Sequence, residues 1–375
     1  MNRFMQLLAE GMKSRGHKTE ILFPRPFFSR LPLPQSLKKW FGYMDQFIVF
    51  PLQAKKKINS YSADTLFVFT DHALGPWVPL VTSKPHIIHC HDFLAQQSAL
   101  YKIAINKTGR SGRIYQKMIH SGYSKGKNFI SVSKKTQEDL LSALSFKPDY
   151  CEVIYNSLSP VFKPLDTDES RHILTQKINI DLTLGYILHV GGNVWYKNRA
   201  GVFQLYEAWR SISNTQLPLV FVGEKPSAVL SKMISKSSYK KDIHFIQDVS
   251  DELLNIIYAA ATVLLFPSLA EGFGWPIAEA MASGCLVITT DQPPMTEVAK
   301  DAGFYISRKP DNKTETAQWA LISARVIEDV IMLPEESRKC FVQCCIENAK
   351  RFSSDTILQK IEAAYLNIIK KETRN

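Results

Sequence analysis

Several familiar signatures are missing from this sequence of 375 residues, and each absence narrows its function. No apolar run reaches the roughly 18 to 20 residues that span a bilayer, which argues against a membrane-spanning helix. The N-terminus lacks a signal-peptide pattern, so we expect a cytoplasmic protein. The fingerprint G-x-G-x-x-G is absent, and the nearest imitation of a P-loop, residues 122–128, lacks the final Ser or Thr. Dehydrogenase and P-loop ATPase functions therefore lose most of their support.

The six cysteines form neither a C-x-x-C pair nor the spacing of a disulfide framework. Cys340 and Cys344 lie four residues apart on a predicted helix, a spacing that could hold a metal ion, but no second pair completes such a site. We expect buried free thiols.

Positive charge is concentrated in the first part of the chain. Residues 1–160 contain 22 Lys and Arg against 10 Asp and Glu, whereas the rest of the chain contains 24 against 25. Such a field favours an anionic partner: nucleic acid, a membrane surface or a phosphorylated substrate. Basic and aromatic residues interleave at 25–30, 38–41 and 55–57, which indicates an interface with anionic lipid or a lipid-linked acceptor. No nucleic-acid recognition motif is present, so we expect no nucleic-acid partner. A solvated basic face is the simpler alternative.

Short apolar runs alternate with helical or loop segments throughout the chain, which is typical of parallel α/β sheets. These expected strands lie at residues 65–70, 86–90, 128–132, 151–155, 186–190, 217–222, 242–246, 262–267 and 286–289. We expect two Rossmann-like domains facing a central cleft.

The expected N-terminal domain is 1–163, the C-terminal domain is 164–352, and residues 353–375 form a C-terminal helix that packs back on the N-terminal domain. At the start of the chain we expect a helix over 5–15, a strand over 17–23 and irregular structure over 25–60.

The most informative segment, residues 264–290, reads as strand, glycine-rich turn, helix and strand. Pro276 suits the first turn of a helix, where a missing N–H costs nothing. A helix N-terminus behind a glycine turn presents backbone N–H groups to an anion such as a diphosphate. Glu271 precedes the turn and Glu279 lies within the helix, so they can serve two separated hydroxyl clusters of one extended ligand.

In a second segment, a strand ends in Gly191 and Gly192 and is followed by Asn193 and Lys197. Close backbone approach together with a positive charge suits a phosphate group. In the first half, His89, His91 and Asp92 close another strand, and the two histidines would share one face. A metal site is conceivable there, although the spacing matches no recognised zinc pattern.

The segment around Glu271 resembles the E-x(7)-E signature of glycosyltransferase family 4, the group 1 retaining glycosyltransferases of the GT-B fold. The resemblance implies that Glu271 contacts the donor sugar and Glu279 the ribose of the nucleotide. Donor-binding residues implied by it are Gly191, Gly192, Asn193, Lys197, Arg199, Gly223, Val249, Glu271, Gly272, Phe273, Gly274 and Glu279.

The implied catalytic residues are Glu271, Lys197 on the diphosphate and His91 near the donor sugar. Relatives often carry an arginine five residues before the lysine; here that position is Gly192, and Arg199 is the candidate substitute. The co-substrate would be a nucleotide-diphosphate sugar, without an essential metal. Asp166 and Asp168 form a D-x-D in the expected linker, where we interpret them as solvated acids.

The implied reaction is transfer of a sugar with retention, by front-face attack of a glycan or lipid-linked acceptor. Relatives begin with a strand and glycine loop before the first helix, whereas this chain begins at the helix, so we expect the first strand to be missing. Two alternatives stay open: a truncated or non-catalytic nucleotide-sugar-binding relative, and a sugar-nucleotide epimerase of the same fold.

Overall fold

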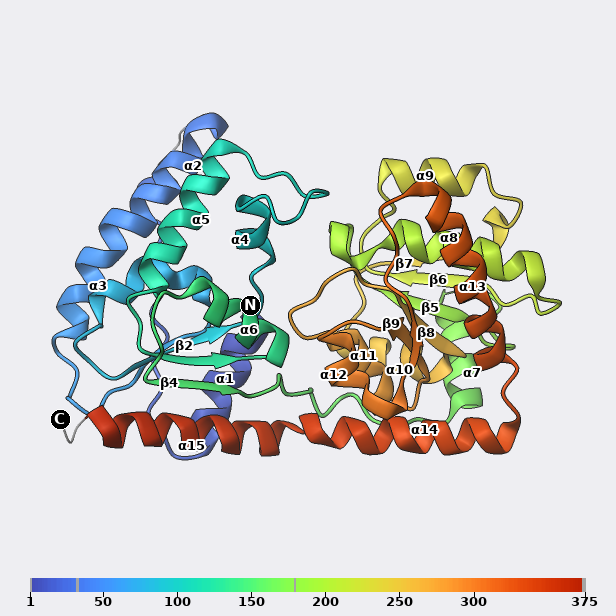
Figure 1. Cartoon of the computed structure of the whole chain (residues 1–375). Coiled ribbons are helices and arrows are strands. Elements are labelled where there is room, and N and C mark those ends of the chain that lie inside the picture. Colours follow the sequence, from blue (N-terminus) through green and yellow to red (C-terminus); the bar gives the residue numbers. More distant parts are fainter. Residues whose placement is uncertain (1, 32–33, 179, 373–375) are drawn as a thin grey trace. The chain divides into compact units, whose positions relative to one another are not determined.

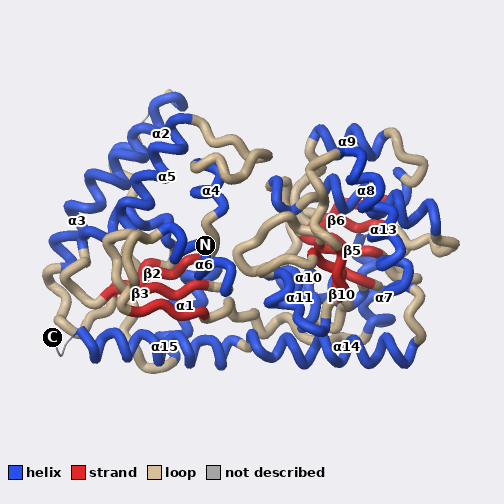
Figure 2. Tube along the Cα trace, in the orientation of Figure 1, coloured by secondary structure: helices blue, strands red, loops and turns tan. Residues whose placement is uncertain are grey.

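The computed structural model describes residues 2–31, 34–178 and 180–372, and its chain forms two compact units (Figure 1). Unit 1 comprises Met1–Tyr155 and Ile357–Asn375, and unit 2 comprises Asn156–Thr356. Each unit contains one parallel β-sheet with helices packed on it (Figure 2). The expected α/β class with two parallel-sheet domains is therefore confirmed.

The sheet of unit 1 has four parallel strands in the order β1-β2-β3-β4. They are β1 (Phe67–Phe69), β2 (His86–Cys90), β3 (Asn128–Ser131) and β4 (Tyr150–Val153). All four coincide with expected strands. Their helices are α1 (Asn2–Ser14), α2 (Gln35–Met44), α3 (Phe50–Ile58), α4 (Leu94–Ala99), α5 (Arg110–Tyr123), α6 (Lys134–Ala143) and α15 (Ser354–Glu372).

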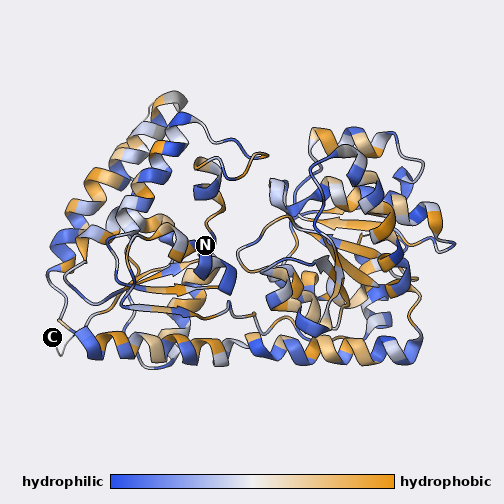
Figure 3. Cartoon of the chain, viewed as in Figure 1, coloured by the Kyte–Doolittle hydropathy of each residue, from blue (hydrophilic) through white to orange (hydrophobic). Residues whose placement is uncertain are grey.

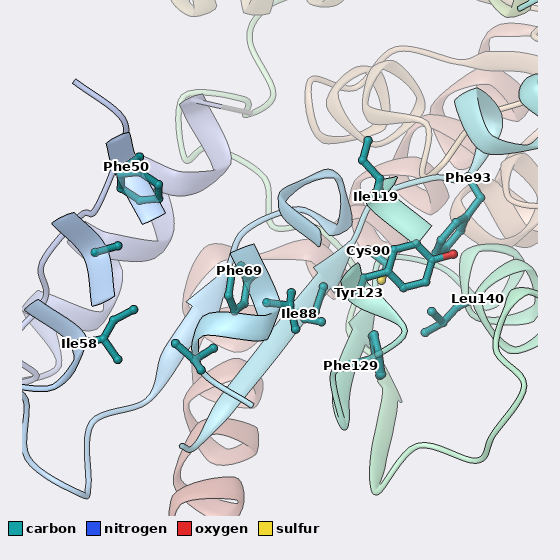
Figure 4. Close-up of a cluster of buried hydrophobic side chains, with 13 residues drawn as sticks. Phe50, Ile58, Phe69, Ile88, Cys90, Phe93, Ile119, Tyr123, Phe129 and Leu140 are labelled. Atoms are coloured by element: carbon teal, nitrogen blue, oxygen red, sulfur yellow. The ribbon is translucent and has the colours of Figure 1, made fainter. Parts of the chain in front are cut away.

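Alternation along β2 places apolar side chains on both faces of this sheet. Ile88 joins a cluster with Phe50 of α3 and Tyr123 of α5, shown in Figure 4. The neighbouring Ile87 joins a separate cluster with Phe4 of α1 and Ile361 of α15. The sheet of unit 1 is therefore buried on both sides, as parallel sheets usually are.

Two expectations for the start of the chain are wrong. Residues 17–23 form no strand; they run mostly exposed, without a ladder partner. Residues 35–58, expected to be irregular, form one helical run in which α2 and α3 are joined by the π-helix η2 (Asp45–Val49). Burial of Phe50, Ala54 and Ile58 at four-residue spacing explains the helix. Pro51 is tolerated because it lies at the start of α3.

Asp45 in η2 fixes the preceding loop. Its buried carboxylate accepts hydrogen bonds from the backbone N–H groups of Phe27, Phe28 and Ser29 at 2.9 to 3.1 Å and from the Ser29 hydroxyl at 2.7 Å. Burial alone would raise the pKa of Asp45, but these hydrogen bonds outweigh it and lower the pKa to about 2.

The sheet of unit 2 has six parallel strands in the order β10-β9-β8-β5-β6-β7. They are β5 (Ile187–Val190), β6 (Leu219–Val222), β7 (Ile243–Ile246), β8 (Val263–Phe266), β9 (Val287–Thr290) and β10 (Phe304–Ile306). The first five confirm expected strands, whereas β10 was not anticipated. Apolar residues predominate in these strands, and much of this sheet is coloured orange in Figure 3.

The helices of unit 2 are α7 (Thr167–Ile178), α8 (Arg199–Ile212), α9 (Ala228–Ser235), α10 (Asp251–Ala260), α11 (Trp275–Ala282), α12 (Met295–Ala299), α13 (Lys313–Ile331) and α14 (Glu335–Ala349). Asp166, in the D-x-D, accepts a hydrogen bond from the backbone N–H of Glu169 at the start of α7, and the side chain of Asp168 is 94% exposed. Across the described residues, no helix is long and apolar enough to cross a bilayer.

Candidate functional site

Two turns of unit 2 meet at the carboxyl ends of its strands. One follows β5 and leads into α8, and the other follows β8 and leads into α11. The Leu269 N–H donates to the Tyr196 carbonyl at 2.8 Å, and the Asn198 side-chain amide donates to the Pro267 carbonyl at 2.9 Å. Two hydrogen bonds connect β9 to the end of β8 and to the loop that follows it. The Thr289 hydroxyl donates to the Phe266 carbonyl, and the Thr290 hydroxyl donates to the Ser268 carbonyl. The two turns are thereby held as one structure.

Lys197 and Glu271 form an ion pair between these turns. The Lys197 Nζ lies 2.8 Å from Glu271 Oε1, and the side chains are only 14% and 9% exposed. The Ser268 hydroxyl donates to the same Oε1 at 2.8 Å. Glu271 Oε2 accepts no hydrogen bond from the described residues. The structure thus joins two residues that lie 74 positions apart in the chain.

The path of the Lys197 side chain depends on Gly191, which has no side chain. A Cβ placed on Gly191 would come within 3.2 Å of Lys197 Cγ and Cδ, so glycine leaves the room in which the lysine crosses the turn. The ammonium ends 4.7 Å from the centroid of the Phe266 ring, a cation–π contact. Packing therefore fixes the direction in which the ammonium points.

Glu279 has a different environment. It lies in α11, which begins after Gly274 at φ 102° and contains Pro276 in its first turn. The Glu279 side chain is buried, and its Oε2 accepts a hydrogen bond from the Tyr258 hydroxyl at 3.1 Å. The Tyr258 hydroxyl thus helps to fix the position of the Glu279 carboxylate.

The carboxylate of Glu224 lies against the turn that follows β5. The Asn193 N–H donates to Glu224 Oε2 at 3.0 Å, and a Cβ on Gly192 would lie 3.1 Å from Glu224 Oε1. The exposed Glu224 side chain therefore lies against the turn that the sequence predicts to bind a diphosphate. An anionic ligand there has to compete with it.

Arg199, expected to substitute for the arginine of relatives, is buried, and its Nε and Nη2 have no hydrogen-bond partner among the described residues. Its Nη1 donates to Asn193 Oδ1 at 2.7 Å and to the Lys225 carbonyl at 3.3 Å, and the guanidinium lies over the Phe221 ring. Burial lowers the pKa of Arg199, while nearby Glu224 raises it. Arg199 thus supports the turn; its contact with a diphosphate stays a prediction.

Gly223 permits the close approach of two turns. Its φ is 127°, and a Cβ there would lie 2.7 Å from the Gly191 carbonyl oxygen. Val249 is half-buried and precedes Ser250, whose hydroxyl caps α10 by accepting from the Leu253 N–H at 3.3 Å.

The aromatic residue of the glycine-rich turn points into the protein. Phe273, between Gly272 and Gly274, is buried, and its ring packs edge-on against Trp275 and Phe352. Its predicted contact with a donor would therefore run through the backbone.

His189 was not anticipated. It is fully buried two residues before Gly191; its Nδ1 lies 3.0 Å from the Leu265 carbonyl, and its Nε2 has no partner among the residues that the structure describes. Burial lowers the pKa of His189 to about 3, so the ring stays neutral beside Lys197. A histidine just before a glycine turn is the signal that sequence reasoning could have used.

His91 lies in unit 1, at the carboxyl end of β2. Its Nε2 lies 2.9 Å from the Thr70 carbonyl, an acceptor, so Nε2 carries a proton and Nδ1 of the neutral ring can accept. The Phe4 ring contacts both His89 and His91, which places both on one face, as expected. His89 is bound to the Tyr365 hydroxyl at 2.7 Å. No group of three potential ligands suited to a metal ion occurs within residues 2–31, 34–178 and 180–372.

Comparison with known proteins identifies the family. The family model described as "Glycosyl transferases group 1" matches residues 170–325, and the one described as "Glycosyltransferase Family 4" matches residues 1–160. The chain belongs to the group 1 glycosyltransferases of family 4.

Relatives of this family 4 chain include two proteins named for O-antigen synthesis. The O-antigen chain mannosyltransferase B of Escherichia coli is 28% identical over 194 residues, which are 51% of this chain and 50% of the relative. The O-antigen chain mannosyltransferase RfbU of Salmonella typhimurium is 27% identical over 192 residues, again 51% and 50%. The matches thus span half the length of each relative.

Solved structures support the GT-B fold. The glycosyltransferase WaaG, described as involved in lipopolysaccharide biosynthesis, has a TM-score of 0.66 at 17% identity, covering 96% of this chain and 94% of that one. HepE of Anabaena, solved with UDP and glucose, also has a TM-score of 0.66 at 17% identity, covering 94% and 87%.

Proposed function

We propose that this family 4 chain is a retaining glycosyltransferase that moves a hexose from a nucleotide-diphosphate sugar to a glycan or lipid-linked acceptor, in the synthesis of a cell-surface polysaccharide. The observation that carries the proposal is the ion pair of Lys197 and Glu271 at the carboxyl ends of β5 and β8. It unites a cation suited to a diphosphate with a carboxylate suited to sugar hydroxyls. The names of the two O-antigen relatives make mannose the first donor sugar to test.

The leaving nucleoside diphosphate gains negative charge as the bond to the anomeric carbon breaks. In the proposed mechanism, the Lys197 ammonium and the start of α11 stabilise this charge electrostatically. Glu271 Oε2 accepts a hydrogen bond from a hydroxyl of the donor sugar, and Glu279, supported by Tyr258, holds the ribose. The backbone of Gly272, Phe273 and Gly274 lines the same turn.

Retention is proposed to follow from front-face attack. Glu271 is tied by Lys197 and Ser268, which suits a positioning carboxylate better than a covalent nucleophile. His91 is proposed to accept a hydrogen bond from the donor sugar through Nδ1. With Lys197 compensating the diphosphate, we propose that the reaction proceeds without a metal ion, so that activity should survive a chelator.

We also propose that unit 1 binds an anionic membrane surface. Along α2, η2 and α3, the exposed apolar residues Leu37, Trp40, Ile48 and Leu52 follow spacings that keep them on one side of the helical run. Exposed lysines lie on the same run at Lys38, Lys55, Lys56 and Lys57. Apolar residues flanked by cations suit the boundary of an anionic bilayer. All six cysteines are free, which supports a reducing, cytoplasmic compartment; the expectation that they are buried holds for three of them and is wrong for Cys340 and Cys344, which are exposed.

Full-length protein should be assayed against a panel of nucleotide-diphosphate sugars with glycan and lipid-linked acceptors, following release of nucleoside diphosphate. Acceptor-dependent release, with the anomeric configuration of the donor kept in the product, supports the proposal. An inverted product contradicts the mechanism. Sugar isomerisation without acceptor would indicate an epimerase, and binding without turnover would indicate a non-catalytic relative.

A further inference from the structure

We propose that Ser268 is a positioning residue. It holds Glu271 Oε1 in place, so that Oε2 remains available to accept a hydrogen bond from the sugar. This inference rests on the proposed function. Ser268 contacts no expected ligand; it acts through Glu271.

The two oxygens of Glu271 have different surroundings. Oε1 accepts from both the Lys197 ammonium and the Ser268 hydroxyl, each at 2.8 Å. Oε2 accepts no hydrogen bond from the described residues. A side-chain atom without a partner is either buried or in contact with solvent, and Oε2 is not among the buried ones. The exposed part of this carboxylate therefore includes Oε2, whose lone pairs face solvent and can accept from a hydroxyl.

Burial and a backbone hydrogen bond fix the position of Ser268. The residue is fully buried, and its carbonyl accepts a hydrogen bond from the Thr290 hydroxyl at 2.8 Å. The preceding carbonyl, of Pro267, is fixed by Asn198. The backbone of Ser268 is thus hydrogen-bonded to β9, while its hydroxyl is hydrogen-bonded to Glu271.

The hydrogen bond from Ser268 to Glu271 becomes important when the donor diphosphate binds. The Lys197 ammonium has three donor hydrogens, and the diphosphate draws on the same cation that holds Glu271. A carboxylate held by Lys197 alone would be free to turn as the ammonium is shared. The Ser268 hydrogen bond is unaffected by the diphosphate, so Oε2 keeps its direction through the reaction.

The test compares Ser268→Ala with Ser268→Thr, which keeps the hydroxyl, and with Thr289→Val. The last variant removes a buried hydroxyl that donates to the Phe266 carbonyl in the same strand end and does not touch Glu271. For each we would measure kcat and KM with the donor found active for the unaltered protein, Kd for the free nucleoside diphosphate by calorimetry, and the thermal unfolding midpoint.

Loss of a hydrogen bond to a charged group predicts a kcat roughly ten- to a hundredfold lower for Ser268→Ala. Kd for the nucleoside diphosphate should stay within about twofold, because this ligand lacks the sugar. Ser268→Thr should recover most of kcat, and Thr289→Val should lose stability without this selective loss of kcat. An unchanged kcat in Ser268→Ala, or an equal loss of kcat and nucleoside diphosphate affinity, overturns the proposal. If the unaltered protein turns over no donor, the proposed function itself fails.

Discussion

Replacing Glu224 with glutamine should tighten the binding of a nucleoside diphosphate. In the unliganded protein the Glu224 carboxylate accepts the Asn193 N–H and lies against Gly192, on the turn where we expect the diphosphate. A diphosphate at this turn meets both a competing acceptor and a like charge. Glutamine keeps an acceptor for the Asn193 N–H, so the turn is preserved while the charge is removed.

The size of the effect follows from Coulomb's law. Two unit charges about 4 Å apart repel by about 1 kcal/mol in water and by about 4 kcal/mol at an effective dielectric constant of about 20. Glu224 is exposed, so the lower figure applies, and Kd should fall about fivefold. Because exposed charges are screened, the gain should shrink as salt is raised.

Titration calorimetry of the full-length protein with a panel of nucleoside diphosphates measures this directly. Glu336→Gln is the matched control, because it removes an exposed carboxylate of the same unit, in the first turn of α14, and should leave Kd unchanged. Weaker binding in Glu224→Gln would refute the reasoning, since it would make Glu224 a support of the bound donor and not a competitor for its site.

Three further predictions concern other parts of the chain. Lys197→Ala should lower kcat roughly 10²- to 10³-fold through loss of leaving-group stabilisation, measured by nucleoside diphosphate release; near-normal activity would contradict the assignment. Asp45→Ala should destabilise the protein by about 2 to 4 kcal/mol in urea unfolding, because three backbone N–H groups lose a charged partner. The pKa of Asp45 is lowered to about 2, so its stabilisation is present above about pH 4 and disappears as the pH falls through about 2; a stability difference that persists below pH 2 would be inconsistent with this. Trp40→Glu with Leu52→Glu should weaken sedimentation with anionic vesicles at least about tenfold, and absence of binding by the unaltered protein at both low and high salt would remove the membrane proposal.

Patterns read over a few residues were sufficient for much of the fold. Nine expected strands are present, because most of them are short runs of mainly apolar residues whose limits are set by neighbouring turn residues. The spacing of Glu271 and Glu279 around a glycine turn likewise identified one side of the proposed donor site. Both signals lie within one segment of the chain.

Local patterns failed where packing partners decide the outcome. Residues 35–58 contain Pro51 and many lysines and aromatics, and their helix became evident only from burial of one face on unit 1. Residues 17–23 end in three consecutive apolar residues and were expected to form a strand, yet a strand exists only where another strand completes its hydrogen bonds.

Contacts between distant segments were decided by the tertiary structure alone. The pairing of Lys197 with Glu271 and the position of Glu224 on the Asn193 turn each join different strand ends. The parallel sheet brings these ends to one edge, and its order, β8-β5-β6, is set by how apolar strands pack rather than by any local motif. Residue identities therefore indicated which chemistry is present, whereas the order of the strands determined which groups share one hydrogen-bond network.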